Sequence, residues 1–480
     1  MAVQQVASFG IVSLLPPLLA IGLAIYTRQV FLSLAAGIWV GFTIIAGWNP
    51  VTGAADAIEG TIAVLGDSGN AEVIVFTFLI GALIATVEAN GGMRGFVQWV
   101  ENARWVTTPR RAQILAWITG IVIFIESNLT ILVAGSVSRP LFDRFKVSRE
   151  KLAYIIDSTS APVCILIPFN AWGALILGIL AEQSVANPLG TFLVAIPMNL
   201  YAVVALVLAG LTVLRGWDLG AMKKAEERTR SGKLAWDHAV AFANPDELAP
   251  APTEDVVLKP RNMLLPIAAM VLSMPIFMWI TGGGSGWGSL AAGSGSTSVL
   301  WAVLLGLGIA WLLSLTQGSL NLDGLSRVGI KGAGGLTGMA VVMWLALTLG
   351  GVTRSLGTGQ YVAGVVGDSV PLFALIPLVF VVTSGIAFAT GSSWGTFAIM
   401  LAVAIPLSNA LGQPPAPFVA AVLSGGIFGD HCSPISDTTI IASLASATDH
   451  IEHVRTQLPY ALIAGGIAAV GFVFIGALLP

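Results

Sequence analysis

Apolar stretches of about 20 residues recur along the whole chain, and this pattern limits what the chain can fold into. A helix of about 20 apolar residues is long enough to cross the roughly 30 Å hydrocarbon core of a bilayer. Only 10% of the 480 residues are charged, against about 25% in a typical soluble domain. Since lipid offers no hydrogen-bond partners, crossing segments must satisfy their own backbone groups, as helices do. The sequence therefore predicts an all-α, multi-pass membrane protein.

Lys and Arg residues mark the cytoplasmic loops of such proteins, and here they predict about ten transmembrane helices plus two opposed re-entrant hairpins. The first hairpin covers residues 112–141 and is interrupted by Glu126-Ser127-Asn128. Each of its arms has about 13–14 residues, too few to cross. Basic residues flank both of its ends, so we expect it to enter from the cytoplasm. A single kinked span is the alternative.

The second hairpin covers residues 371–407, is interrupted at Thr390-Gly391-Ser392-Ser393, and has no Lys or Arg close to either end. We therefore expect it to enter from outside. Two further segments, residues 152–180 and 417–447, read as crossing helices that are each broken by polar residues and a proline. Proline removes a helix hydrogen bond, so these breaks free backbone carbonyls at membrane depth.

The two halves of the chain match in order. Ser127 corresponds to Ser392 (392 − 127 = 265), and Pro162 corresponds to Pro434 (434 − 162 = 272). Each half contains an odd number of crossings, so the second copy must be inverted, as in many secondary transporters. We expect repeats at residues 1–214 and 263–480. The cytoplasmic connector between them, residues 215–262, is expected to be part helical and part Pro-rich coil, and its role is interpreted as that of a plain linker.

Two stretches carry a family resemblance. SREKLAYIIDSTSAPVCILIP (Ser148–Pro168) and GDHCSPISDTTIIAS (Gly429–Ser443) resemble the signature stretches of the NhaC-type sodium/proton antiporter family, within the ion-transporter superfamily. The resemblance implies a transport domain that moves against a dimeric scaffold domain, with hairpin tips that help to bind Na⁺. We therefore expect a homodimer in the cytoplasmic (inner) membrane of a bacterium. Some relatives move small carboxylates or amino acids, so the substrate stays open.

The polar residues at the tips and breaks predict two related Na⁺ sites. Na⁺ is a hard cation and prefers oxygen ligands, which hydroxyls, amides, carboxylates and freed carbonyls supply. Hydroxyls in membrane helices also bond to their own helix carbonyls, which is the structural alternative for each serine. The first expected site joins one tip to one break: Ser127, Asn128, Asp157, Ser158 and Ser160. The second joins the other pair: Ser392, Ser393, Ser433, Asp437 and Thr438.

Proton coupling needs a buried carboxylate or imidazole. Burial favours the neutral form of a carboxyl group and a bound cation favours its charged form, so the two ions compete. Asp157 is the leading candidate, followed by Asp437, Glu126 and His431. His431 could instead pin the broken segment by a hydrogen bond, and Asp430 could cap the short helix that follows.

Other polar residues carry weaker signals. Asn170 and Trp172 lie near the first break and are candidates for an organic-solute pocket, with packing as the alternative. His450-Ile451-Glu452-His453 has a metal-like spacing, but we interpret it as the solvated start of the last helix.

The leading functional hypothesis is Na⁺/H⁺ antiport by alternating access. The second is Na⁺- or H⁺-coupled movement of a small organic solute. A channel fits less well, because two closed half-sites suit a transporter that occludes its ion better than they suit a continuous pore. An intramembrane hydrolase lacks a readable nucleophile–base pair, so we expect no enzyme. We expect the lipid bilayer, Na⁺ and H⁺ as partners, no cofactor and no nucleic acid.

Overall fold

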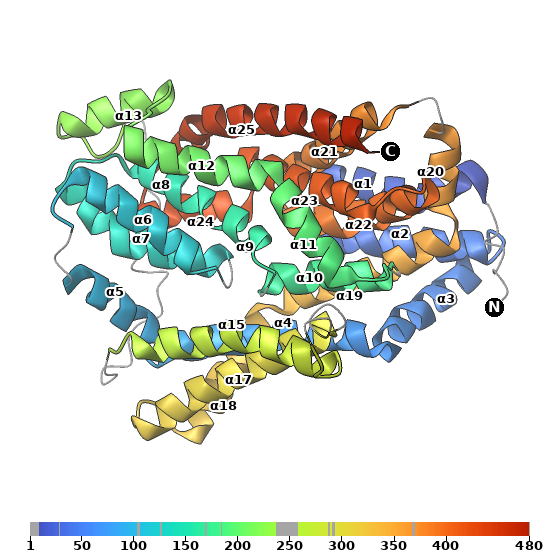
Figure 1. Ribbon diagram of the computed structural model, residues 1–480, viewed down its shortest axis with the longest axis horizontal. Coiled ribbons are helices and arrows are strands. Elements are labelled where there is room, and N and C mark those ends of the chain that lie inside the picture. The colour runs from blue at the N-terminus through green and yellow to red at the C-terminus, as the bar shows by residue number, and fades with distance from the viewer. Residues whose placement is uncertain are drawn as a thin grey trace.

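The computed structural model describes residues 9–27, 29–102, 106–124, 127–168, 170–183, 185–236, 258–286, 289, 293–366 and 370–479, and every regular element among them is a helix (Figure 1). The first half contains η1 (Gly10–Leu14), α1 (Leu15–Thr27), α2 (Val30–Ile45), α3 (Pro50–Ala63), η2 (Val64–Gly66), α4 (Ser68–Ala89), α5 (Gly92–Asn102), α6 (Pro109–Val122), α7 (Ser127–Arg144), α8 (Arg149–Ser158), α9 (Ala161–Leu166), α10 (Ala171–Glu182), α11 (Pro188–Met198), α12 (Leu200–Arg215) and α13 (Ala221–Arg230).

The second half contains α15 (Arg261–Thr281), α17 (Gly295–Thr316), α18 (Leu322–Gly335), α19 (Thr337–Ser355), α20 (Thr358–Val366), α21 (Leu372–Thr390), α22 (Ser393–Ala410), α23 (Pro415–Cys432), α24 (Asp437–Ser446) and α25 (His450–Leu478). Side chains that precede many of these helices cap their free N–H groups. Ser148 does so for α8, Ser392 for α22, Ser436 for α24 and Asp449 for α25.

Seven of the described helices are long and apolar enough to cross a membrane: α4, α15, α17, α19, α21, α22 and α25. Three bent helix pairs raise the number to as many as 10, if each pair is one span. These pairs are α2 with the segment from Pro50 to Gly66, α11 with α12, and α23 with α24, with bends of 118°, 45° and 48°. The predicted class, an all-α multi-pass membrane protein, is confirmed.

The helices form two groups (Figure 1). α4, α15, α17 and α18 pack on one another and make a layer along the lower edge of the view. The larger group above it contains α6 to α9, α12 and α21 to α25. α21 packs closely on both α23 and α25, and α24 packs on α7 and α8. The larger group therefore brings the two predicted breaks and both predicted hairpins together.

Each predicted hairpin is a pair of helices in the structure. α6 and α7 pack against each other, and the chain between them includes residues 125–126, which lie outside the described residues. α21 and α22 have 19 and 18 residues, so the arms of the second hairpin are each long enough to pass as spans. Gly391 turns the chain between them with a φ of 64°, a left-handed conformation that suits glycine.

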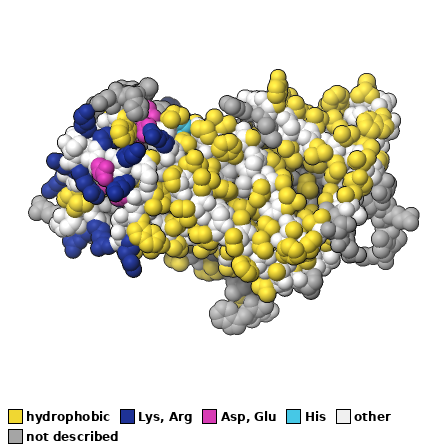
Figure 2. All heavy atoms as spheres, turned by 90° about the horizontal axis from the view of Figure 1, so that it is seen from above, with side chains coloured by type: hydrophobic (Ala, Val, Ile, Leu, Met, Phe, Trp, Pro, Cys, Tyr) yellow, Lys and Arg dark blue, Asp and Glu magenta, His cyan; other side chains and the backbone are white. Residues whose placement is uncertain are grey.

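Basic side chains gather at one end of the molecule, the end where α13 lies (Figure 2). The distribution of Lys and Arg predicts that this end faces the cytoplasm. α13 is anchored to the start of α8 here. The Arg228 guanidinium pairs with Glu150 at 2.6 Å, and Glu226 accepts hydrogen bonds from Ser148 N and Oγ at 2.8 and 2.7 Å. α13 is the helical part expected in the connector, and the buried Arg228–Glu150 pair holds it against α8, so this part does more than link the two halves. Residues 237–257 lie outside the described part.

Candidate functional site

Asp157 lies in the last turn of α8 and is fully buried. The helix ends directly after it, and hydroxyls of the next residues satisfy the carbonyls that the end sets free. Thr159 Oγ1 donates to Ile155 O at 2.8 Å, and Ser160 Oγ donates to Asp157 O at 2.8 Å. Pro162 then stands in the first turn of α9, where a missing N–H costs nothing. The local sequence therefore ends α8 and leaves the Asp157 carboxylate deep inside the protein.

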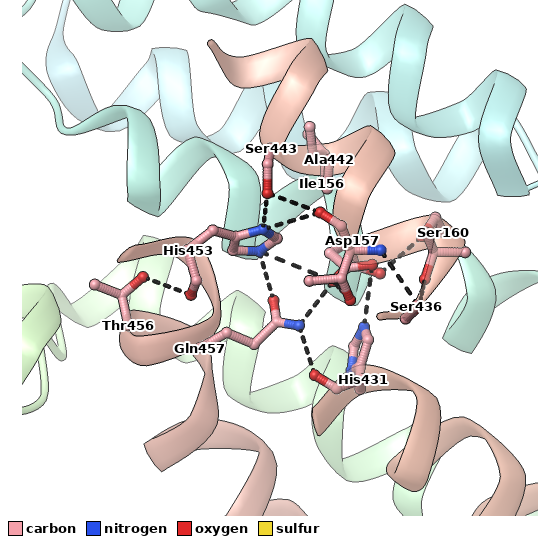
Figure 3. Close-up of polar contacts among 12 residues, drawn as sticks. Ile156, Asp157, Ser160, His431, Ser436, Ala442, Ser443, His453, Thr456 and Gln457 are labelled. Carbon is pink, nitrogen blue, oxygen red and sulfur yellow. Dashed lines mark hydrogen bonds and ion pairs between the residues drawn. The ribbon is translucent and has the colours of Figure 1, made fainter. Parts of the chain in front are cut away.

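Nitrogen and hydroxyl donors from three other helices surround that carboxylate (Figure 3). Gln457 Nε2 donates to Asp157 Oδ2 at 2.7 Å, and Thr439 Oγ1 donates to the same oxygen at 3.2 Å. His431 Nε2 lies 3.6 Å from Oδ1, and His453 Nε2 lies 3.9 Å from Oδ2. Among the described residues, Oδ1 receives no hydrogen bond. We call these five residues the Asp157 cluster.

His431 is held from its other side. Its Nδ1 lies 2.9 Å from the Tyr201 hydroxyl on α12, and its carbonyl accepts a hydrogen bond from Gln457 Nε2 at 2.9 Å. When Tyr201 donates to Nδ1, the neutral imidazole carries its proton on Nε2, the atom that faces Asp157. The contacts of His431 therefore fix the end of α23 and also orient the ring toward the carboxylate.

A second buried carboxylate, Asp430, sits in oxygen-rich surroundings. Its Oδ2 accepts a hydrogen bond from Ser393 Oγ at 3.1 Å, and its Oδ1 has no partner among the described residues. The hairpin tip is pressed against the break: a Cβ at Gly391 would lie 2.6 Å from Ile435 O. Ser433 Oγ ties the break to the hairpin by donating to Phe388 O at 2.8 Å. We call Ser393 and Asp430 the Asp430 pair.

The remaining residues of the second predicted Na⁺ site have other contacts. Ser392 and Ser436 cap α22 and α24, and Thr438 Oγ1 lies 3.0 Å from Ser436 Oγ. Asp437 has an exposed side chain, and its Oδ1 accepts a hydrogen bond from Thr438 N at 2.8 Å. The sequence therefore located the helix break, while the structure buries Asp430 there and leaves Asp437 exposed.

Most described residues of the first predicted Na⁺ site are buried. Ser127, Ser158 and Ser160 are buried, and Asn128 Oδ1 is a buried atom without a hydrogen-bond partner among the described residues. Glu126 lies outside the described residues. α6 packs tightly on the break, since a Cβ at Gly120 would clash with Thr159. The first tip and the first break therefore belong to one packed region.

Asn170 and Trp172 are engaged in packing contacts. Asn170 caps α10 through Gly173 N, and its Nδ2 donates to Phe124 O and Cys164 O, both at 2.8 Å. The Trp172 ring is buried against Trp394 and Phe397. In this structure both residues therefore make packing and capping contacts, the alternative to lining an organic-solute pocket.

Sequence reasoning missed three residues around Asp157: Thr439, His453 and Gln457. The stretch His450–His453 does begin the last helix, with Asp449 as its cap, but His453 is fully buried. The signal was the spacing of His450, His453 and Gln457, which places all three on one face of a helix. Within the described part of the chain, no group of three or more His, Cys, Asp or Glu residues could hold a metal ion.

Comparison with known proteins identifies the family. The family model described as "Na+/H+ antiporter family" matches residues 174–477. An uncharacterized protein of Haemophilus influenzae is 32% identical over 98% of this chain and 91% of its own length. The malate-2H⁺/Na⁺-lactate antiporter of Bacillus subtilis is 38% identical over 22% of each chain. The Alcanivorax borkumensis YdaH transporter has a similar fold, with a TM-score of 0.55 and 17% identity over 88% of this chain and 89% of that one.

These findings confirm the predicted resemblance and make the protein a secondary transporter. The chain belongs to the Na⁺/H⁺ antiporter family.

Proposed function

We propose that the protein exchanges Na⁺ for H⁺, with Asp157 as the proton carrier and the Asp430 pair as part of the Na⁺ site. The observation that carries this proposal is the difference between the surroundings of two buried carboxylates. Asp157 is faced mainly by N–H groups, and Asp430 by a hydroxyl. The alternating access that such exchange requires would place this site in contact with each side of a bacterial cytoplasmic membrane in turn.

The surroundings of Asp157 do not suit a metal ion. N–H groups donate hydrogen bonds and offer no lone pair to a cation. Three nitrogens, from His431, His453 and Gln457, lie within 3.9 Å of the carboxylate oxygens. Oδ1 accepts no hydrogen bond among the described residues, which leaves it able to take a proton. We therefore assign Asp157 to proton transport and leave Na⁺ to the other carboxylate.

The surroundings of Asp430 suit Na⁺. A hard cation needs oxygen ligands. Asp430 Oδ1 is buried and unsatisfied among the described residues, Ser393 Oγ is 3.1 Å from Oδ2, and the neighbouring helix break exposes main-chain carbonyls. The carboxylate would balance the charge of the ion, and the serine would contribute a neutral oxygen.

The two carboxylates couple the ions electrostatically. His431 follows Asp430 in the chain and lies 3.6 Å from Asp157, so one residue connects the two groups. A cation bound at Asp430 favours the charged form of Asp157 and promotes release of its proton. By thermodynamic reciprocity, a proton on Asp157 weakens Na⁺ binding by the same factor. This competition is the requirement for antiport.

A second candidate, exchange of a small organic solute, is supported by the Bacillus subtilis relative, which is named as a malate-2H⁺/Na⁺-lactate antiporter. Next to the Asp157 cluster, a cavity lined by Tyr154, Ser158, Tyr201, His431, Gln457 and Tyr460 has a volume of about 10 Å³. That is room for about one water molecule. An organic solute would therefore need a different conformation of this region. The homodimer predicted from the resemblance remains a proposal.

Flux measurements in proteoliposomes test the proposed exchange. Purified protein is reconstituted with a pH-sensitive dye inside, and an inward Na⁺ gradient is imposed without organic solutes. We expect the lumen to become alkaline as protons leave in exchange for entering Na⁺. Asp157→Asn protein should give no change, and Asp323→Asn, at an exposed site on α18, should behave like the wild type. Proton movement that needs an added carboxylate or amino acid would favour the second candidate.

A further inference from the structure

A chain of polar contacts connects Asp157 with the surface at the cytoplasmic end. From the carboxylate, His453 Nε2 is 3.9 Å away, and His453 Nδ1 lies 2.9 Å from Ser443 Oγ. The same hydroxyl lies 3.0 Å from His450 Nδ1, and His450 Nε2 lies 2.6 Å from Pro434 O. His453 and Ser443 are fully buried, whereas His450 is partly exposed. Figure 3 shows the inner part of this chain, from Ser443 through His453 to Asp157 and Gln457.

Hydrogen-bond chemistry assigns the ring protons at both ends of the chain. A carbonyl only accepts, so the contact with Pro434 O requires a proton on His450 Nε2. The Gln457 amide directs its NH₂ group at two acceptors, Asp157 Oδ2 and His431 O. Its carbonyl oxygen therefore faces His453 Nε2 at 3.0 Å, which requires a proton on that nitrogen as well.

The hydroxyl group of Ser443 cannot donate a hydrogen bond to both imidazole rings at once. Ser443 has one hydroxyl hydrogen, and its Oγ lies near three partners: the Nδ1 atoms of His450 and His453, and Thr439 O at 2.8 Å. His453 Nδ1 also lies 3.3 Å from Thr439 O. If Ser443 donates to one Nδ1, the other Nδ1 must itself carry a proton and donate to the oxygen; if Ser443 donates to Thr439 O, both Nδ1 atoms must carry one. When all of these contacts are made, at least one of the two rings therefore carries a second proton. A shift of the hydroxyl hydrogen moves that proton from one ring to the other.

We propose that His450, Ser443 and His453 form a proton relay between the cytoplasmic surface and Asp157. The inference rests on the proposed role of Asp157 as proton carrier. His450 gives its Nδ1 proton to Ser443 Oγ while the Ser443 hydroxyl gives its own proton to His453 Nδ1. His453 then turns its Nε2 proton from Gln457 Oε1 to Asp157 Oδ2 and releases it there, once the two atoms, 3.9 Å apart in this structure, come within hydrogen-bond distance. The N–H bond at His450 breaks, the O–H bond at Asp157 forms, and water restores the proton of His450.

The surrounding charges suit this direction of transfer. The titratable groups that face His453 are the Asp157 carboxylate from α8, the His431 ring at the end of α23 and His450 on its own helix. Arg149 of α8 donates to Ala447 O at 3.1 Å, close to the outer end of the relay. A carboxylate at the inner end and a cationic group near the outer end both favour movement of the proton inward.

Two fluxes separate the relay from the proposed exchange. Wild-type protein in proteoliposomes is assayed for Na⁺-driven H⁺ flux and for Na⁺–Na⁺ exchange followed with a radioactive tracer, which needs no proton. Ser443→Ala removes the bridging hydroxyl. Ser446→Ala is the matched control, since Ser446 is also buried on α24 and donates to Ala442 O. We expect the ratio of H⁺ flux to Na⁺ exchange to fall at least roughly tenfold in Ser443→Ala and to stay at the wild-type value in the control.

A second variant tests the relay independently, in case Ser443→Ala fails to fold. His450→Gln changes the partly exposed end of the relay and should lower the same ratio. Equal ratios in wild type, Ser443→Ala and His450→Gln would overturn the relay while leaving the exchange intact. If Ser443→Ala loses both fluxes, the relay is tested by His450→Gln alone, and a wild-type ratio in that variant would overturn it. Absence of Na⁺-driven H⁺ flux in the wild type would instead refute the proposed function.

Discussion

The side-chain amide of Gln457 donates to Asp157 Oδ2 at 2.7 Å across 300 residues of sequence. The same NH₂ group also reaches His431 O, so one side chain on α25 joins the ends of α8 and α23. These two helix ends are the two breaks that the sequence predicts. The contact therefore connects the breaks of both halves of the chain through a third helix.

Replacing the Asp157 carboxyl group tests the proton carrier. In Asp157→Asn the side chain keeps nearly the same shape but can no longer take up and release a proton. We expect Na⁺-driven H⁺ flux to fall to the level of empty liposomes, while detergent-solubilised protein elutes from a sizing column as the wild type does. Coupled transport at the wild-type rate would rule out Asp157 as the carrier.

Ser393 tests the Na⁺ site. Ser393→Ala removes the hydroxyl that donates to Asp430 Oδ2 at 3.1 Å. A hydrogen bond to a charged group contributes about 1.5–3 kcal/mol, which corresponds to roughly a tenfold or larger rise in the KM for Na⁺. Ser408→Ala is the control, because Ser408 is buried on the same helix and donates to Ile405 O. The KM is measured from transport rates at increasing Na⁺; a rise in both variants would point to helix packing instead.

The Tyr201 hydroxyl tests the orientation of His431. Tyr201→Phe keeps the ring but removes the contact with His431 Nδ1 at 2.9 Å. Loss of one hydrogen bond of about 1 kcal/mol should slow Na⁺-driven H⁺ flux about fivefold. Tyr201→His is not equivalent, because it introduces another titratable ring. An unchanged rate in Tyr201→Phe would mean that the other contacts of His431 suffice to orient it.

The buried ion pair at the connector should contribute to stability. Arg228→Ala leaves Glu150 buried without its guanidinium partner, which lies 2.6 Å away in the wild type. Breaking such a pair from one side costs about 3–5 kcal/mol, so we expect a clearly lower Tm in detergent. Arg215→Ala, at an exposed residue near the same end, is the control. Equal Tm values for the two variants would show that α13 is not held by this pair.

Cysteine labelling tests which end of the molecule faces the cytoplasm. Cys164 and Cys432 are both buried, so they should stay unlabelled by a membrane-impermeant maleimide. We expect Ala410→Cys, at the exposed end of α22, to be labelled in intact cells. Lys224→Cys, exposed on α13, should be labelled only after the membrane is opened. The opposite pattern would invert the topology that the basic residues predict.

Much of the fold was predictable because it depends on local properties of the sequence. Hydrophobic length determines which segments can cross a bilayer. Proline and the short polar residues around it end helices wherever they occur, so the breaks near Asp157 and Asp430 could be located. The position of the helix on residues 221–230 against α8 was harder to predict. Its anchoring depends on pairing with Glu150 of another helix, and a polar segment looks the same whether or not such a partner is present.

The same distinction between local sequence properties and contacts of distant helices applies to the candidate site. The sequence by itself determined the membrane class, the two breaks and the choice of Asp157 as a candidate, because these follow from residue types and their spacing, and two of its stretches carried the resemblance to the family. Only the tertiary structure decided that Asp430 is buried while Asp437 is exposed, and that His453 and Gln457 reach Asp157. The reason is physical: the partners of a buried carboxylate are chosen by how distant helices pack, and α8, α23, α24 and α25 meet only in the folded protein.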